Sequence, residues 1–357
     1  MTAPPVLSSV FDLSRLPEHD RFVAEPSDIA YVSGSRLAGF GNARSDLDLF
    51  VVYEDPARAK GAPRMFILDE FRVDMERYSR TTLDEVVRAV NEVDLADPVA
   101  VLGLAHATID LYYRTAIGEP VANGEGFHAL LEAFDRERCR AVYARWAACR
   151  AASLLAEARA LLASPHPDRA YLRARRALSL AVDSFAASEG GGGDGYPSAK
   201  WCFVKLARRF GHDAPEFRRP WALKARGDRT VEAYVAEVAA YASSVGVPSA
   251  VAGTIEEARL ARDPQTVLFE VGARPLLVQR KTRVFELNPV GLRAWWLFDG
   301  ARTLGEVVET LLAEGFPNRE AVTSHLARFA TQLRDDGLLL GDLYPARFTD
   351  RLTEGAA

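Results

Sequence analysis

Two aspartates at alternate positions, followed at once by apolar residues, predict a strand in the first third of the chain. The run is Asp-Leu-Asp-Leu-Phe-Val-Val-Tyr, residues 46–53. Because side chains i and i+2 of a strand point to the same face, we expect Asp46 and Asp48 to project together while Leu47 and Leu49 point into the fold. Two carboxylates this close repel each other unless a cation lies between them, and Mg²⁺ prefers such oxygen donors.

A Gly-Ser pair lies ten residues before the first of these aspartates. Gly34 and Ser35 follow the apolar run 28–33, which is predicted to be a strand. Glycine lets the backbone approach an anion closely, and the free N–H groups and the Ser35 hydroxyl can hold phosphate oxygens. A third carboxylate is expected from the run 71–78, where Asp74 and Glu76 share a strand face and either residue qualifies.

This combination of a Gly-Ser turn, about ten residues, a D-x-D pair and a later apolar-Asp-apolar strand resembles the DNA polymerase β-like nucleotidyltransferase superfamily. The resemblance implies an α+β fold with a mixed sheet and helices. It also implies nucleotidyl transfer assisted by two Mg²⁺ ions, for which Mn²⁺ could substitute. Asp46, Asp48 and Asp74 would be the catalytic metal ligands, and the family pattern favours Asp74 over Glu76.

The same resemblance implies where the nucleoside triphosphate binds. Gly34, Ser35 and the Ser45 that precedes the D-x-D pair would hold its phosphates. A plain alternative is a Gly-Ser turn beside a solvated edge strand that happens to carry aspartates.

The length of 357 residues suggests two or three domains, and changes between strand-like and helix-like residue patterns indicate their boundaries. We predict a catalytic domain at 1–120, an all-helical middle domain at 121–263, a small domain at 264–345 and a tail at 346–357. Net charge −5 argues against general nucleic-acid binding, and three widely spaced cysteines fit a reducing compartment. No apolar run of membrane-spanning length and no signal peptide are recognised, so a cytoplasmic location without membrane contact is expected.

The middle domain is predicted from apolar residues at three- and four-residue spacing. Residues 136–162 and 168–188 read as long helices, and the Gly-rich run 190–195 as a loop between helices. In several nucleotidyltransferases such helices cover the acceptor cleft, and the segment around Lys200 resembles one in which a lysine before tryptophan faces the nucleotide. Lys200 could equally be a surface residue, and Arg175 and Arg176 could face the triphosphate or only solvent.

The small domain is predicted to contain three strands followed by three helices. Asn288-Pro289 reads as a helix start, Thr303 with Glu306 as a capping box, and Gly337 as a helix C-terminus. The run L-N-x-x-G, an aromatic helix and D-G-x-R-T resembles the PqqD-like peptide-recognition domain. That resemblance implies a winged helix-turn-helix fold that binds the leader of a ribosomally made peptide.

In this family the leader adds as a strand and packs against the third helix. By position, the receiving residues would be Arg283, Val284, Phe285, Glu286, His325, Arg328, Phe329 and Gln332. Phe329 could equally belong to the core. A DNA-binding winged helix is the alternative, and nine Lys/Arg against nine Asp/Glu over 270–336 argue against it.

The two resemblances together predict a nucleotidyltransferase whose substrate is a precursor peptide. AMP from ATP would pass to a hydroxyl of the core peptide while the leader is tethered. One alternative is a small-molecule nucleotidyltransferase of the antibiotic- or sugar-modifying kind. Another is a non-catalytic chaperone that presents the peptide to another enzyme.

Overall fold

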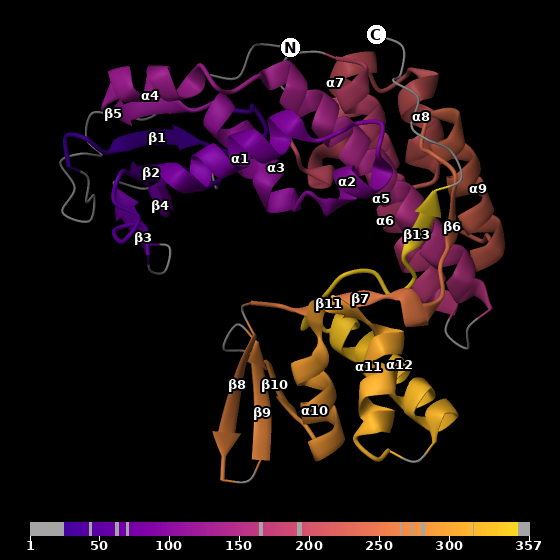
Figure 1. Ribbon diagram of the computed structural model, residues 1–357. Coiled ribbons are helices and arrows are strands. Elements are labelled where there is room, and N and C mark those ends of the chain that lie inside the picture. The colour runs from indigo at the N-terminus through magenta and orange to yellow at the C-terminus, as the bar shows by residue number, and fades with distance from the viewer. Residues whose placement is uncertain are drawn as a thin grey trace.

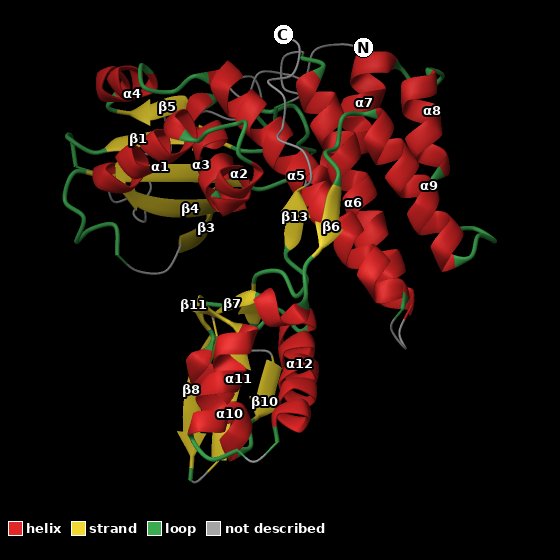
Figure 2. Ribbon diagram, turned by 45° about the vertical axis from the view of Figure 1, so that its right-hand side comes forward, coloured by secondary structure: helices red, strands yellow, loops and turns green. Residues whose placement is uncertain are grey.

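The computed structural model describes residues 25–42, 45–60, 64–68, 71–163, 167–190, 195–264, 266–272, 274–279, 283–316 and 318–348. Figure 1 shows an N-terminal sheet with its helices, a bundle of longer helices beside it, and a separate C-terminal body on one side of both. Figure 2 shows the same three parts, with the C-terminal body joined near the paired strands β6 and β13.

The N-terminal part is built on a mixed sheet, as predicted, and five strands form it within the described residues. Its strands are β1 (Ile29–Ser33), β2 (Leu47–Tyr53), β3 (Arg64–Leu68), β4 (Phe71–Ser79) and β5 (Glu119–Ala122), in the order β3-β4-β2-β1-β5. The pair β2–β4 is parallel, and the pairs β1–β2, β1–β5 and β3–β4 are antiparallel. The sequence Asp69-Glu70 predicts a hairpin turn between β3 and β4, and these two residues lie outside the described part of the chain.

Strand β2 alternates as its sequence predicts. Leu47, Leu49 and Val51 are buried in one apolar cluster, whereas Phe50 and Val52 belong to a second cluster on the opposite face. Helices cover that second face (Figure 1). They are α1 (Arg80–Glu92), α3 (His106–Ala116) and α4 (Gly124–Leu131), whereas α2 (Pro98–Gly103) packs through Val101 against the long helix at Arg136–Leu162. By the two-residue repeat of a strand, Asp46 and Asp48 belong to this helix-covered face.

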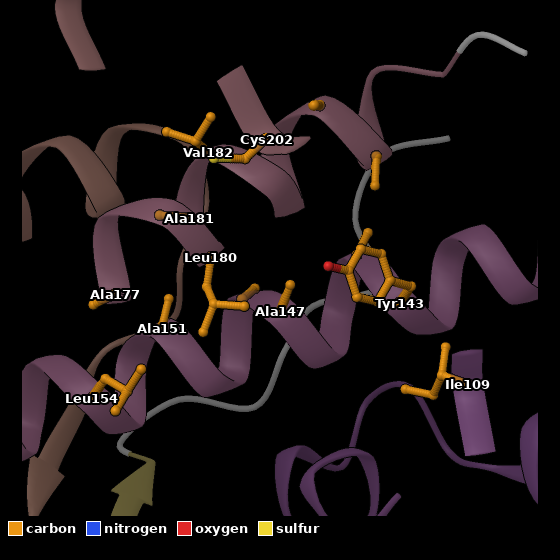
Figure 3. Close-up of a cluster of buried hydrophobic side chains, with 14 of the residues drawn as sticks. Ile109, Tyr143, Ala147, Ala151, Leu154, Ala177, Leu180, Ala181, Val182 and Cys202 are labelled. Atoms are coloured by element: carbon orange, nitrogen blue, oxygen red, sulfur yellow. The ribbon is translucent and has the colours of Figure 1, made fainter. Parts of the chain in front are cut away.

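The middle part is dominated by two long helices at the predicted positions. Helix α5 runs over Arg136–Leu162 and α6 over Pro167–Ser188. Figure 3 shows Ala147 and Ala151 of α5 opposite Ala177 and Ala181 of α6, and all four are buried. Small side chains let two helices approach closely and exclude water along the contact. The shorter elements η3 (Ala199–Trp201), α7 (Cys202–Phe210), α8 (Pro215–Ala222) and α9 (Val231–Ser244) complete it.

The prediction that residues 121–263 are all helical is wrong at the C-terminal end of that region. Strand β6 (Ala250–Ala252), the 3₁₀ turn η4 (Ile255–Glu257) and strand β7 (Arg259–Arg262) follow α9. Strand β13 (Ala346–Phe348), at the start of the predicted tail, pairs with β6. Strands of three or four residues carry too little periodicity to be recognised without their distant partners.

The C-terminal part begins with three strands followed by three helices, in the predicted order. They are β8 (Thr266–Val271), β9 (Arg274–Gln279), β10 (Arg283–Glu286), α10 (Pro289–Leu297), α11 (Leu304–Ala313) and α12 (Arg319–Asp335). The sheet order is β10-β9-β8, and β11 (Asp299–Thr303) and β12 (Leu339–Leu340) form a second small sheet with β7. The winged helix-turn-helix assignment itself stays a prediction.

The predicted helix caps of this part are confirmed. The Asn288 side chain accepts a hydrogen bond from the Gly291 N–H at 2.7 Å. Thr303 and Glu306 form a reciprocal capping box. Gly337 follows α12 with φ of 77°, in the left-handed region that glycine adopts without a Cβ clash. Of the helices within the described ranges, none is long and apolar enough to cross a membrane.

Candidate functional site

The parallel pairing of β2 and β4 decides which acidic residues meet. Asp48 lies opposite Asp74 in the register, and Glu76 lies opposite Phe50, two residues further along the strands. The Glu76 carboxylate accepts a hydrogen bond from the Tyr78 hydroxyl at 2.6 Å. The register therefore places Asp74, rather than Glu76, directly beside Asp48.

The glycine of the Gly-Ser corner lies against the Asp48 carboxylate. Ser33, the last residue of β1, is the register partner of Asp48, so Gly34 follows at the same end of the sheet. Gly34 has φ of 91°, and a Cβ built on it would lie 1.8 Å from Oδ2 of Asp48. Only glycine permits this backbone path and this close approach. The structure therefore brings Gly34, Asp48 and Asp74 together at one edge of the sheet.

The loop between β1 and β2 is a turn held by its own backbone. The Ser35 carbonyl accepts hydrogen bonds from the N–H groups of Phe40 and Gly41, both at 2.7 Å. The Ser45 hydroxyl accepts from the Asn42 N–H at 2.9 Å, and the Arg36 guanidinium donates to the Ser45 carbonyl at 2.6 Å. Ser45 thus fixes the loop, and its contact with a nucleotide stays a prediction.

Two arginines that the sequence reasoning missed pair with the three aspartates. Arg72 donates to both oxygens of Asp74 at 3.1 and 3.2 Å and lies 3.8 Å from Asp46. Arg114, on α3, lies 3.2 Å from Oδ1 of Asp48. Arg72 and Asp74 are two residues apart on β4. The two-residue repeat that put Asp46 and Asp48 on one face of a strand therefore also puts Arg72 beside Asp74.

The position of Arg114 is set by tertiary contacts. It is hydrogen-bonded through its carbonyl to the Ser33 hydroxyl at 2.5 Å, and its guanidinium pairs with Asp110 one helical turn earlier at 2.8 Å. Burial raises the pKa of Asp48 to about 6, although Arg114 opposes that shift. The neighbouring Glu76 and Asp74 carboxylates make smaller contributions in the same direction as burial. Asp48 is therefore a crowded carboxylate, held by one cation and repelled by its neighbours.

The three aspartates fit divalent metal binding in donor chemistry and in strand register. A raised carboxylate pKa marks a place where added positive charge would be favourable. Within the described ranges, however, no group of three His, Cys, Asp or Glu side chains is gathered into a ready-made metal site. Arg72 pairs with Asp74 and Asp46, and Arg114 pairs with Asp48. Metal binding would therefore exchange arginine partners for the ion.

The segment that contains Lys200 packs against the Gly-Ser loop. Phe40 of that loop stacks on Trp201 and on Tyr196, with ring centroids 5.6 Å apart in both cases. Arg208 of α7 donates to the Gly39 carbonyl at 2.6 Å. The Lys200 ammonium lies 5.0 Å from the Trp201 ring, on an exposed side chain. Lys200 thus belongs to the wall beside the loop, and its contact with phosphate stays a prediction.

Arg175 and Arg176 face different surroundings. Arg176 lines a cleft of about 670 Å³ between the helical part and the C-terminal part. Arg175 is exposed on α6 and does not line that cleft. Arg176 is exposed as well, so the solvent-facing alternative fits both residues, and a contact of either arginine with the triphosphate stays a prediction.

The predicted peptide groove corresponds to a cavity of about 640 Å³ between β10 and α12. We call it the leader groove. Five of the predicted residues line it: Phe285, Glu286, His325, Phe329 and Gln332. Strand β10 lies at the end of its three-stranded sheet, so within the described part of the chain its outer edge has no strand partner. An apolar trough beside a free strand edge is the geometry that receives an added peptide strand.

The remaining predicted groove residues lie elsewhere or outside the described side chains. Val284 is 62% exposed on β10 and does not line the groove. Arg328 is exposed on α12 and is also absent from its lining. The side chain of Arg283 lies outside the described part. Phe329 has both predicted roles, because it lines the groove and packs against the core at Phe298, with ring centroids 6.4 Å apart.

Comparison with known proteins identifies the C-terminal part. Residues 275–339 match the family described as "Coenzyme PQQ synthesis protein D (PqqD)". The chain therefore contains a PqqD domain, which is the class of small domain that the three strands, three helices and groove define.

The rest of the chain has a weaker likeness. The crystal structure of a nucleotidyltransferase-like protein from Exiguobacterium sibiricum 255-15 is 15% identical, covers 61% of this chain and 67% of that chain, and gives a TM-score of 0.35. A TM-score this low does not establish a shared fold. No curated protein matches the chain.

Proposed function

We propose that this protein is a Mg²⁺-dependent nucleotidyltransferase that modifies a ribosomally made precursor peptide. The observation that carries the proposal is the register of Asp48 with Asp74 beside Gly34, in a chain that also contains a PqqD domain. The fine chemistry we favour is transfer of AMP from ATP to a hydroxyl of the peptide, with pyrophosphate as the leaving group.

We call Gly34, Ser35, Asp46, Asp48 and Asp74 the catalytic edge, and each of these residues has a separate role. Asp46, Asp48 and Asp74 would hold two Mg²⁺ ions, which stabilise the attacking and leaving oxygens when bound. Asp74 would also orient the acceptor hydroxyl and take its proton. The backbone N–H groups at Gly34 and Ser35 would hold the β- and γ-phosphates, as successive amide groups in a turn can.

Arg72 and Arg114 follow from the same geometry as additional phosphate ligands. Each now pairs with an aspartate that the metal ions would claim. A guanidinium released in this way lies within reach of the triphosphate and matches its oxygens in pairs. When a metal ion takes the place of the arginine beside each aspartate, the released arginine can bind the nucleotide. Metal binding would thus be coupled to nucleotide binding.

The PqqD domain supplies the peptide. Its free β10 edge would hydrogen-bond the leader main chain, and the apolar lining formed by residues such as Phe285 and Phe329 would select its side chains. Tethering raises the local concentration of the core peptide at the catalytic edge without new contacts there.

The test is intact-mass measurement of a short precursor peptide encoded beside the gene, incubated with the enzyme, each NTP and Mg²⁺. A nucleotide-sized gain that requires both Asp48 and the leader supports the proposal. Release of pyrophosphate with small hydroxyl or amine compounds, and none with the peptide, would assign the protein to the small-molecule class. Leader binding with no transfer to any acceptor would leave a peptide-presenting chaperone.

A further inference from the structure

Tyr196 belongs to the segment before η3 and packs between the Gly-Ser loop and helix α3. Its ring stacks on Phe40 of the loop, with centroids 5.6 Å apart, and packs on Tyr113 of α3 at 5.5 Å. The Phe40 N–H in turn donates to the Ser35 carbonyl at 2.7 Å. Tyr113 is followed by Arg114, which pairs with an aspartate of the catalytic edge. The Tyr196 ring is therefore held by the two elements that carry Ser35 and Arg114.

The main chain at Tyr196 is fixed by buried polar groups of the helices. The Lys205 ammonium donates to the Tyr196 carbonyl and, at 2.5 Å, to the Asp183 carboxylate. Both Lys205 and Asp183 are fully buried. The His106 ring donates to the next carbonyl, that of Pro197, at 2.8 Å. A residue anchored in this way loses little conformational freedom when its side chain binds a ligand.

The Tyr196 hydroxyl, in contrast to its ring and main chain, is free. Only 5% of the residue is exposed, and among the described residues its hydroxyl has no hydrogen-bond partner. The hydroxyls of the fully buried Tyr31, Tyr143 and Tyr234 all take part in hydrogen bonds. Because a buried hydroxyl without a partner is unfavourable, the Tyr196 hydroxyl is a group that gains from a ligand.

The charges that act on this hydroxyl are those of the candidate site. Burial raises the pKa of Tyr196, the Arg114 guanidinium lowers it, and the Asp110 and Asp48 carboxylates raise it. The net shift is upward, so the hydroxyl stays protonated at neutral pH and can donate a hydrogen bond. A hydroxyl donor and a guanidinium on the same side of a site suit an anionic oxygen ligand.

The position of Tyr196 across the sheet indicates which anionic oxygen it would meet. In the order β4-β2-β1, Asp74 lies on β4 and Gly34 follows β1. Tyr196 packs on the loop after β1, where the Gly-Ser backbone would hold the β- and γ-phosphates. The acceptor hydroxyl would lie beside Asp74, two strands away. The phosphate end of the site is therefore the part that Tyr196 adjoins.

We propose that the Tyr196 hydroxyl is a ligand of the nucleoside triphosphate and donates a hydrogen bond to an oxygen of its β- or γ-phosphate. This assignment rests on the nucleotidyl transfer proposed above. The helical part would thus contribute a nucleotide-binding residue to the catalytic edge, and this residue would favour a triphosphate over a monophosphate.

The test uses the full chain with Mg²⁺ and a ribose-labelled fluorescent ATP, with the matching labelled AMP as the control ligand and fluorescence anisotropy as the readout. Tyr196→Phe keeps the ring and its stacking and removes only the hydroxyl. It should weaken the binding of labelled ATP about tenfold, the effect expected for one hydrogen bond to a charged group. The affinity for labelled AMP, which lacks the β- and γ-phosphates, should not change.

Tyr241→Phe is the matched control. Tyr241 lies on α9, is 3% exposed, and among the described residues its hydroxyl also has no hydrogen-bond partner. The groups whose charges act on it are Cys202 and Arg219, and neither belongs to the candidate site. The control variant should bind both labelled nucleotides as the unsubstituted protein does.

Three results would overturn the assignment of Tyr196. They are an unchanged affinity of Tyr196→Phe for labelled ATP, an equal loss of affinity for labelled ATP and AMP, or an equal loss in the two variants. If the unsubstituted protein bound no ATP, the proposed nucleotidyl transfer would fail together with this assignment. ATP binding without transfer to any acceptor would leave the comparison of the two tyrosine variants readable on its own.

Discussion

The catalytic edge and the leader groove contrast in how the chain positions their residues. At the catalytic edge, the strand register brings carboxylates beside one another, and Gly34 lets the backbone approach one of them. Arginines form ion pairs with these carboxylates. The leader groove is an apolar trough beside a strand edge. Catalysis needs charged groups held in place by backbone geometry. Recognition of an extended peptide needs a strand edge with free main-chain hydrogen-bonding groups and an apolar surface beside it.

The strongest way to separate the two regions is to remove one carboxylate. Asp48→Asn should lower nucleotidyl transfer at least about a thousandfold, because it removes a charged metal ligand. Leader binding, measured by anisotropy, should stay unchanged, since the groove lies in another part of the chain. Retained transfer in this variant would remove the catalytic edge from the mechanism.

A smaller change tests whether the backbone itself is part of the catalytic edge. In Gly34→Ala the new Cβ would meet Oδ2 of Asp48 at 1.8 Å, on a residue with φ of 91°. Because the carboxylate must move aside, transfer should fall about a hundredfold, in line with the cost of misplacing a catalytic group by 1 Å.

Gly211→Ala is the matched control for that change. Gly211 also has positive φ, 87°, but a Cβ there would meet nothing within 4 Å. It should cost about 1 kcal/mol of stability through backbone strain and leave transfer intact. Equal loss of transfer in both variants would mean that strain, and not the approach to Asp48, is responsible.

The sequence alone predicted what local patterns determine. Helix α5 has the predicted bounds, because three-to-four spacing of apolar residues is read within one segment. The grouping of Asp48 with Asp74 follows from strand geometry once the two strands are placed in parallel. The short strands β6 and β7 were missed, since each is defined by a partner that lies far away in the chain.

The ion pairs of the site show the same limit. Arg72 follows from the two-residue repeat of β4 and could have been predicted with Asp74. Arg114 could not, because its contact with Asp48 depends on how α3 packs across the sheet. The cleft that Arg176 lines is likewise formed by residues of α5, α6 and α12 together, so no spacing within one helix indicates it.

The groove can be tested on one helix with two exposed residues. His325→Ala should weaken leader binding about five- to tenfold, because His325 lines the groove and its ring would contact the added strand. Arg328→Ala, three residues further along α12 and outside the groove lining, is the control and should have little effect. The reverse order would restore the sequence-based placement of Arg328 in the groove.

The smallest expected effect is the decrease in the free energy of unfolding caused by the partly buried Asp48 carboxylate. The pKa of Asp48 is raised to about 6, so the folded protein binds a proton there more tightly than the unfolded chain does. Asp48 therefore opposes folding increasingly as pH rises from about 4 to 6, and the full penalty is present above that range.

Asp48→Asn should consequently stabilise the metal-free protein. We expect a gain of about 1–2 kcal/mol at pH 7.5, less than the full two-unit shift implies because partial solvent access screens the charge. The gain should shrink as pH falls through 6 and vanish near pH 4. Urea unfolding at these pH values measures it. A loss of stability at pH 7.5 would mean that the pair with Arg114 outweighs the burial of the charge, and the catalytic edge would then be a stabilising feature of the fold.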